Sequence, residues 1–213
     1  MESTDRSGLS IQTENLGKRF NREWIFRKLS LTFHAGRIYA ITGPNGSGKS
    51  TLLQILWGQS LPSSGTIQYV SGDTLIPPEE VFRRISIATP YMDLIDEFTL
   101  EEQIQFHFKF KPIRKGVSLP ALIDLMYLEN ARNKQIGNFS SGMRQRLKLA
   151  LAFYTESDMV FLDEPGTNLD QRAFSWYVAE LQKLPKNALV LIASNNPAEY
   201  PQAGQIINIM DFK

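Results

Sequence analysis

The sequence contains no cysteine among its 213 residues and only two histidines, His34 and His107. The absence of cysteine excludes disulfides and thiolate metal sites in this chain. Two histidines this far apart in the sequence do not suggest a metal cluster. A chain without cysteine suits a cytosolic setting, where disulfides are rare, and we expect one here.

An excess of one charge and a long apolar run are also missing. The 23 basic and 22 acidic residues give a net charge of +1, which offers no argument for nucleic acid or anionic lipid as a partner. No apolar run approaches the roughly 20 residues that a membrane helix needs, and the polar N-terminal segment lacks the apolar centre of a signal peptide. The hydrophobic content of 42% is that of an ordinary globular protein with one core.

Residues 43–51 read GPNGSGKST and match the phosphate-binding loop pattern G-x-x-x-x-G-K-[ST] in full. The preceding segment 37–42 predicts a buried strand, and 50–57 predicts the start of a helix. The glycines allow backbone N–H groups to converge on a phosphate, and the helix N-terminus adds positive charge. We expect Lys49 to contact the β- and γ-phosphates and Ser50 to bind Mg²⁺. The predicted nucleotide-binding residues of this loop are Gly43, Pro44, Asn45, Gly46, Ser47, Gly48, Lys49, Ser50 and Thr51.

Two adjacent carboxylates follow a second apolar segment. Residues 159–162 predict a buried strand that ends in Asp163 and Glu164. A Mg²⁺-nucleotide needs a carboxylate at the end of a neighbouring strand, where it supports the metal and positions water. We expect Asp163 to lie beside Mg²⁺ and Glu164 to act with Lys49 in catalysis, taking a proton from the attacking water. An acidic turn that only caps the strand is the alternative.

The order of the elements predicts an α/β fold. Residues 9–14 and 24–33 alternate as half-buried strands do, whereas 188–193 is almost wholly apolar, as in a parallel sheet covered on both faces. Thr99 and Glu102 form a capping box that favours a helix, although the phenylalanines after it alternate with polar residues as in a strand. Strands that alternate with helices along the chain indicate an α/β protein.

Three further motifs accompany the phosphate loop. Residues 139–143, FSSGM, resemble a signature loop that usually reads Leu-Ser-Gly-Gly-Gln; residues 163–165, DEP, match a Walker B segment; and residues 168–170, NLD, match a D-loop. Together these motifs make the chain similar to the ATP-binding subunit of ABC transporters. The resemblance covers about residues 9–210.

The resemblance implies a single ABC ATPase domain over residues 1–213. Its fold is that of a P-loop NTPase, with a mainly parallel central sheet, an N-terminal antiparallel β part and a helical signature subdomain. The nucleotide-binding core is expected at about 9–90 and 156–213, and the helical subdomain at about 91–155. Phe20 matches the aromatic platform on which adenine stacks in this family, and an ordinary core phenylalanine is the alternative.

The family sandwiches ATP between the phosphate loop of one subunit and the signature loop of another. Ser140, Ser141 and Gly142 open a helix, so they fit a second anion-binding terminus. With one phosphate loop and one signature per chain, two chains are needed to close two sites, and we expect a homodimer. The resemblance implies ATP and Mg²⁺ as cofactors, an integral membrane transporter subunit on a separate chain as partner, and a place on the cytoplasmic face of the membrane. No nucleic acid partner is expected.

The sequence departs from the family pattern at three places. The signature carries Ser141 for glycine and Met143 for glutamine, and Pro90 stands where the Q-loop glutamine is expected. Asn195 replaces the switch histidine, and its amide can donate a hydrogen bond to the γ-phosphate but carries no charge. Slow hydrolysis is therefore expected.

Two other functions remain open at this point. The first is an ATP-dependent dimerising switch or regulatory module with very slow hydrolysis, which Pro90 and Asn195 favour and the intact Glu164 opposes. The second is a DNA-maintenance ATPase with the same nucleotide-binding domain. The absence of a long heptad insertion and the near-neutral charge argue against the DNA enzyme.

Overall fold

The computed structural model describes residues 8–213, which form two compact units. The first, here the sheet unit, comprises residues 8–85, 158–163 and 185–213. The second, here the helical unit, comprises residues 86–157 and 164–184.

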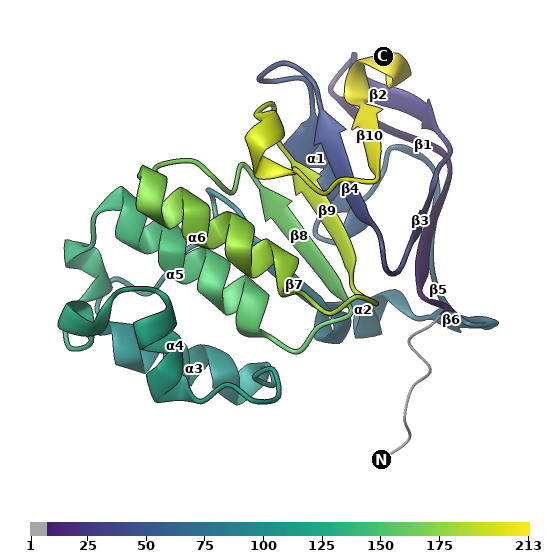
Figure 1. The fold of residues 1–213 in the computed structure, drawn as a ribbon. Helices are drawn as coiled ribbons and strands as arrows, with labels where there is room; N and C mark the ends of the chain where they lie inside the picture. The colour runs from purple at the N-terminus through teal and green to yellow at the C-terminus, as the bar shows by residue number, and fades with distance from the viewer. Residues whose placement is uncertain (1–7) are drawn as a thin grey trace. The chain divides into compact units, whose positions relative to one another are not determined.

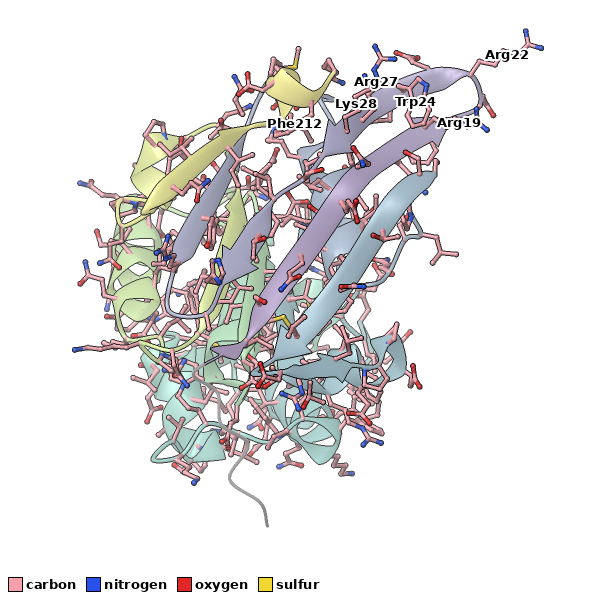
Figure 2. The ribbon with its side chains drawn as sticks, turned by 90° about the vertical axis from the view of Figure 1, so that its right-hand side faces the viewer. Arg19, Arg22, Trp24, Arg27, Lys28 and Phe212 are labelled. Atoms are coloured by element: carbon pink, nitrogen blue, oxygen red, sulfur yellow. The ribbon has the colours of Figure 1, made fainter. Side chains whose placement is uncertain are left out.

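The sheet unit begins with an antiparallel sheet in the order β2 (Glu23–Leu29), β1 (Ser10–Phe20), β5 (Ser64–Ser71) and β6 (Thr74–Ile76). The short strand β3 (Thr32–His34) pairs with the first residues of β1, while β2 pairs with its last residues to form a hairpin (Figure 2). The long strand β1 therefore has a different partner at each end.

The prediction of a single strand over residues 24–33 is wrong. The segment is divided between β2 and β3, and Lys28 near the break has a φ of 57°. This left-handed backbone interrupts regular pairing, so the alternation of apolar residues continues across two strands that pair with different parts of β1.

The sheet unit also contains a parallel sheet, in which β10 (Gln205–Asn208), β4 (Ile38–Thr42), β9 (Leu189–Ala193) and β8 (Met159–Asp163) lie side by side in that order (Figure 1). Every residue of β8 and β9 is buried, as the apolar sequence predicts for a central parallel strand. Helix α1 (Lys49–Leu56) packs on β8 and β9, and the ring of Trp57 meets that of Phe161 edge-on, 5.7 Å between centroids. The α/β class with a parallel and an antiparallel sheet is confirmed.

Three shorter elements complete the sheet unit. Helix α2 (Pro78–Arg84) begins with proline at a position that tolerates it, and the 3₁₀ turns η4 (Pro197–Glu199) and η5 (Ile209–Phe212) flank β10. Turn η5 packs on β2. Strand β7 (Ile85–Ala88) leads into the helical unit.

The helical unit contains α3 (Leu100–Phe110), α4 (Leu119–Leu125), α5 (Ser141–Tyr154) and α6 (Gln171–Gln182), with short 3₁₀ turns between α4 and α5. Helices α5 and α6 pack on each other. Within residues 8–213, no helix combines the length and apolar character required to cross a bilayer.

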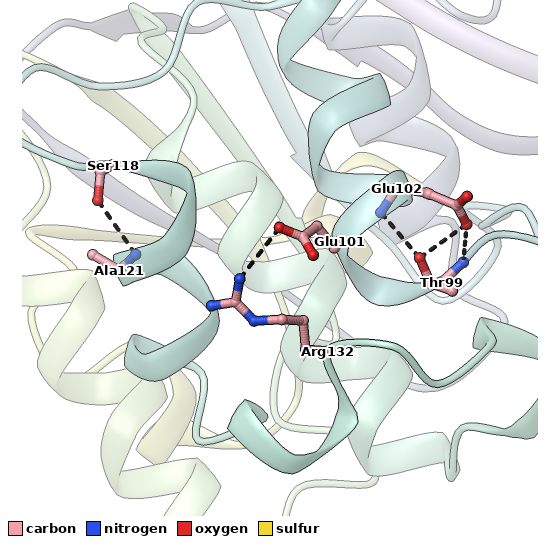
Figure 3. Close-up of polar contacts among 6 residues, drawn as sticks. All are labelled: Thr99, Glu101, Glu102, Ser118, Ala121 and Arg132. Atoms are coloured by element: carbon pink, nitrogen blue, oxygen red, sulfur yellow. Dashed lines mark hydrogen bonds and ion pairs between the residues drawn. The ribbon is translucent and has the colours of Figure 1, made fainter.

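The helix predicted after Thr99 is confirmed as α3. It forms because the capping box outweighs the strand-like spacing of the phenylalanines. The Glu102 backbone N–H donates to Thr99 Oγ1 (3.3 Å), and the Thr99 backbone N–H donates to Glu102 Oε2 (2.8 Å), as Figure 3 shows. These hydrogen bonds satisfy two donors that a helix start otherwise leaves open. The alternating phenylalanines then form a chain of edge-on ring contacts among Phe98, Phe106 and Phe110.

Candidate nucleotide-binding site

The loop between β4 and α1 has the backbone that a phosphate cradle needs. Gly43, Gly46 and Gly48 have φ values of 142°, 76° and 107°, which side-chain-bearing residues rarely adopt. A Cβ on Gly48 would also collide with Ile25 of β2, so this position requires glycine for space as well as for conformation. Helix α1 begins at the next residue, so its N-terminus faces the loop.

The side chains of this loop include a buried cation. Lys49 is 4% exposed, and its Nζ donates to the carbonyl oxygens of Gly43 (2.9 Å) and Pro44 (3.3 Å). These acceptors are neutral, so they hold the ammonium in place and leave its charge to attract an anion. The Ser47 hydroxyl is buried without a hydrogen-bond partner within residues 8–213, which is typical of a group that serves a ligand. The loop therefore fits a polyphosphate.

A carboxylate lies at the same edge of the parallel sheet. Asp163 is the last residue of β8 and is 2% exposed. It is in register with Ala193 of β9, which is in register with Ile41 of β4, just before the loop. Because parallel strands bring their carboxyl ends to one edge, Asp163 and the hydroxyl of Ser50 fit as ligands of a Mg²⁺ that accompanies the phosphates.

Asn195 contacts the phosphate loop directly. Its Oδ1 accepts from the Gly43 backbone N–H (3.1 Å), and its Nδ2 donates to Asn45 Oδ1 (3.1 Å). The residue at the expected switch position thus ties the end of β9 to the loop after β4. Sequence reasoning did not predict the contact with Asn45, because no local signal connects residues that are 150 positions apart.

Phe20 ends β1 and is 54% exposed, so the alternative of a core phenylalanine is wrong. The ammonium of Lys18 lies over its ring, 5.3 Å from the centroid, and also donates to Ser60 Oγ and the carbonyl of Leu61. An exposed ring is available for stacking on a base. Its role as an adenine platform stays a prediction.

The signature segment lies in the helical unit at the start of α5. Ser140 caps the helix, with its Oγ accepting from the Met143 backbone N–H (3.2 Å), and both Ser140 and Ser141 are exposed. A Cβ on Gly142 would lie 2.8 Å from the carbonyl oxygen of Asn168, so the D-loop backbone requires glycine at this position. The segment therefore presents an open helix N-terminus, which favours an anion.

Glu164 has a strained backbone, with a φ of 45° that costs about 1–2 kcal/mol for a residue other than glycine. A turn holds this conformation, because the Thr167 backbone N–H donates to the Glu164 carbonyl (3.1 Å). The buried Gln145 of α5 donates to the carbonyl of Pro165 (2.9 Å) and fixes the next residue. Strain maintained in this way is typical of functional segments, and no sequence pattern predicted it.

Pro90, at the expected Q-loop position, is held through its backbone. Lys148 of α5 donates to the carbonyl oxygens of Pro90 (2.7 Å) and Thr89 (3.3 Å), and burial lowers the pKa of this lysine. The cation thus anchors the backbone of this loop to α5. Sequence reasoning missed Lys148, since a lysine within a helix usually faces solvent.

A phosphate loop between a central parallel strand and a helix, with an acidic residue at the same sheet edge, defines a P-loop nucleotide-binding protein of the α/β class. The family model described as "ABC transporter" matches residues 26–167, and the chain belongs to this family as an ATP-binding protein.

Several known proteins are similar to this chain. The Nod factor export ATP-binding protein I of Burkholderia lata is 32% identical over 166 residues, which cover 76% of this chain and 55% of the relative. The daunorubicin/doxorubicin resistance ATP-binding protein DrrA of Streptomyces peucetius is 34% identical over 167 residues, which cover 77% of this chain and 51% of the relative. This chain spans about half the length of these two curated relatives.

A solved structure supports the fold. It is described as a dimeric post-hydrolysis state of the ATP-binding cassette MJ0796 with ADP and Pi, and it superposes with a TM-score of 0.78. The superposition covers 93% of each chain at 21% identity, so the likeness shows the fold alone.

Proposed function

We propose that this chain binds and hydrolyses ATP and that the reaction powers a membrane transporter. The observation that carries the proposal is the loop at residues 43–51, in which a buried ammonium, converging backbone N–H groups and a helix N-terminus favour the same polyanion. The identity of the family supports ATP as the nucleotide.

Each residue has a chemical role in this proposal. Lys49 offsets charge on the β- and γ-phosphates, and Ser50 and Asp163 hold Mg²⁺, which neutralises further charge when bound. Glu164 accepts a proton from the water that attacks the γ-phosphate. Phe20 stacks on the adenine, since its ring is exposed.

We place the signature segment in a second active site. Ser140, Ser141 and Gly142 present the open N-terminus of α5, and a chain with one phosphate loop and one signature completes two sites only by pairing with a second ATPase subunit. We propose a homodimer with ATP sandwiched between subunits. The solved neighbour that resembles this fold is described as dimeric, which supports the arrangement.

The proposed partner is an integral membrane subunit on a separate chain, with this protein on the cytoplasmic face. The support comes from the curated relatives, which are described as ATP-binding proteins for Nod factor export and for drug resistance. In this proposal the membrane subunit, and not this chain, determines which substrate is transported.

A second function, an ATP-dependent switch with very slow turnover, is favoured by the contacts of Asn195. Its amide is neutral, and both of its polar atoms bond within the loop region, to Gly43 and Asn45. A histidine at this position offers a charge-assisted hydrogen bond, which is roughly twice as strong as a neutral one.

Phosphate release by the purified chain distinguishes the two functions. We expect Mg²⁺-dependent ATP turnover whose rate per chain rises with protein concentration, because dimers complete the sites. ATP-dependent dimers without measurable turnover would instead support the switch, and a chain that neither binds nor hydrolyses ATP would overturn both proposals.

A further inference from the structure

The hairpin of β1 and β2 places Arg19 and the acidic residue Glu23 on opposite faces. Arg19 pairs across the hairpin with Trp24, and Phe20 pairs with Glu23. Since neighbouring residues of a strand point to opposite faces, Arg19 and Trp24 lie on one face and Phe20 and Glu23 on the other. The acidic residue is thus separated from Arg19 and shares the face that carries Phe20.

Irregularities in β2 add two cations further from the turn of the hairpin. The pairing shifts twice, between Leu16 and Lys18 and between Lys18 and Arg19. Between the buried residues Phe26 and Leu29 of β2 stand two exposed residues, Arg27 and Lys28, where regular alternation allows one. Lys28 has the φ of 57° expected of a bulge.

The resulting cationic face comprises Arg19, Arg22, Arg27 and Lys28, all exposed, with Arg22 projecting from the turn of the hairpin (Figure 2). Within residues 8–213, no ion pair or side-chain hydrogen bond engages Arg22, Arg27 or Lys28. The near-neutral net charge of the whole chain conceals this local concentration. Four exposed cations on a protein surface, three of them without a polar partner among the described residues, attract a polyanion.

Aromatic side chains accompany the cations. Trp24 is half-buried with its ring against Gly17, and the guanidinium of Arg19 lies over that ring, 5.8 Å from the centroid. Phe212 belongs to η5, which packs on β2, and Figure 2 shows it on the Lys28 side of the hairpin, away from the turn. Because Arg19 and Gly17 occupy the surroundings of the indole, the ring is poorly placed to stack on the bases of a nucleic acid.

We propose that the cationic face binds the anionic headgroups of a lipid bilayer. Clusters of Lys and Arg attract anionic membrane surfaces, and tryptophan is enriched where a protein meets the headgroup layer. A nucleic acid would have the charge but would lack the stacking contribution. The inference goes beyond ATP turnover and uses none of the nucleotide-binding residues.

Sedimentation with sucrose-loaded vesicles tests the lipid surface. The parent chain is expected to bind vesicles of phosphatidylcholine with phosphatidylglycerol, to bind phosphatidylcholine alone only weakly, and to dissociate at high salt. The triple variant Arg22→Glu, Arg27→Glu and Lys28→Glu should lose binding by a factor on the order of 100, since each cation near such a surface contributes about fivefold.

A matched control reverses three exposed cations elsewhere: Arg37→Glu, Lys115→Glu and Lys186→Glu. It makes the same change in net charge and should bind within about twofold of the parent, because these cations lie outside the cluster. Equal losses in both triple variants would overturn the proposal. The single variant Arg22→Glu, in the exposed turn, keeps the test valid if the triple variant fails to fold.

A single-stranded oligonucleotide provides the competing measurement. We expect at most weak binding that the two triple variants change alike. Tight oligonucleotide binding that only the hairpin triple variant abolishes would overturn the lipid assignment and identify a nucleic acid surface instead.

Discussion

At the scale of single residues, the position of Lys49 explains why one side chain matters so much to the proposed site. The ammonium is buried, is held by two carbonyl oxygens, and has no role in the apolar core. Lys49→Ala should abolish tight ATP binding, because it removes the cation that offsets triphosphate charge in a partly dry site. Isothermal titration calorimetry measures the effect, with the exposed Lys186→Ala as control. Unchanged affinity in Lys49→Ala would refute the assignment of the loop.

Asn195 offers a second test at this scale. Asn195→His should raise the single-turnover rate of hydrolysis about tenfold, equivalent to about 1.4 kcal/mol of barrier, because an imidazole can stabilise charge on the transferred phosphoryl group. Asn195→Ala should lower the rate and leave ATP affinity nearly unchanged.

The contact with Asn45 decides how Asn195 acts. If Asn45→Ala slows hydrolysis as much as Asn195→Ala, and the double variant is no slower than either, Asn195 positions the loop. If Asn45→Ala leaves the rate intact, Asn195 acts on the nucleotide itself. Rates equal to the parent in Asn195→His and Asn195→Ala would exclude both roles.

At the scale of elements, helix α3 depends on its capping box (Figure 3). Thr99→Ala should destabilise the protein by about 1 kcal/mol, because the Glu102 N–H loses Thr99 Oγ1 as its acceptor. Urea unfolding measures the difference. The exposed ion pair of Arg132 with Glu101 (3.2 Å) provides the control, and Arg132→Ala should cost less than about 0.5 kcal/mol. A cost as small for Thr99→Ala would show that packing alone fixes the helix.

The packing of α3 near the end of α5 predicts that the stability of the fold depends on pH. Burial, assisted by the charge of Lys111, lowers the pKa of His107 to about 4, and its Nε2 lies 2.9 Å from Thr155 Oγ1. The unfolded chain takes up this proton at about pH 6.5 and the folded chain only near pH 4. Stability should therefore fall as the pH drops through this window, by up to about 3 kcal/mol.

His107→Gln isolates that contribution, because glutamine keeps a hydrogen-bonding group and does not titrate. Urea unfolding at neutral pH and near pH 4.5 should show a smaller loss for the variant than for the parent. Equal losses would mean that other groups carry the acid sensitivity.

At the scale of the whole molecule, each chain carries one phosphate loop and one signature segment, so its proposed active form is a pair. Glu164→Gln should keep ATP binding, remove turnover and trap an ATP-bound dimer, because the amide cannot accept the proton of the attacking water. Size-exclusion chromatography with ATP, and with ADP as control, reveals the dimer. Adding Lys49→Ala to Glu164→Gln should abolish the ATP-bound dimer. Turnover within about threefold of the parent would show that a group other than Glu164 accepts the proton.

The sequence by itself determined the features that arise from neighbouring residues. The phosphate loop, the acidic end of β8 and the capping box of α3 each occupy fewer than ten consecutive residues, and their backbone preferences act locally. The buried parallel strands β8 and β9 were also predictable, because burial on both faces demands continuous apolar residues.

Tertiary structure alone decided the features that join distant segments. The bond between Asn195 and Asn45 spans 150 positions, and the bond from Lys148 to Pro90 spans 58. The division of residues 24–33 into β2 and β3 follows from which part of β1 each strand meets. Alternation of apolar residues specifies which side of a strand is buried, but the choice of partner strand depends on long-range packing, so bulges and the cationic face they create appear only in the folded chain.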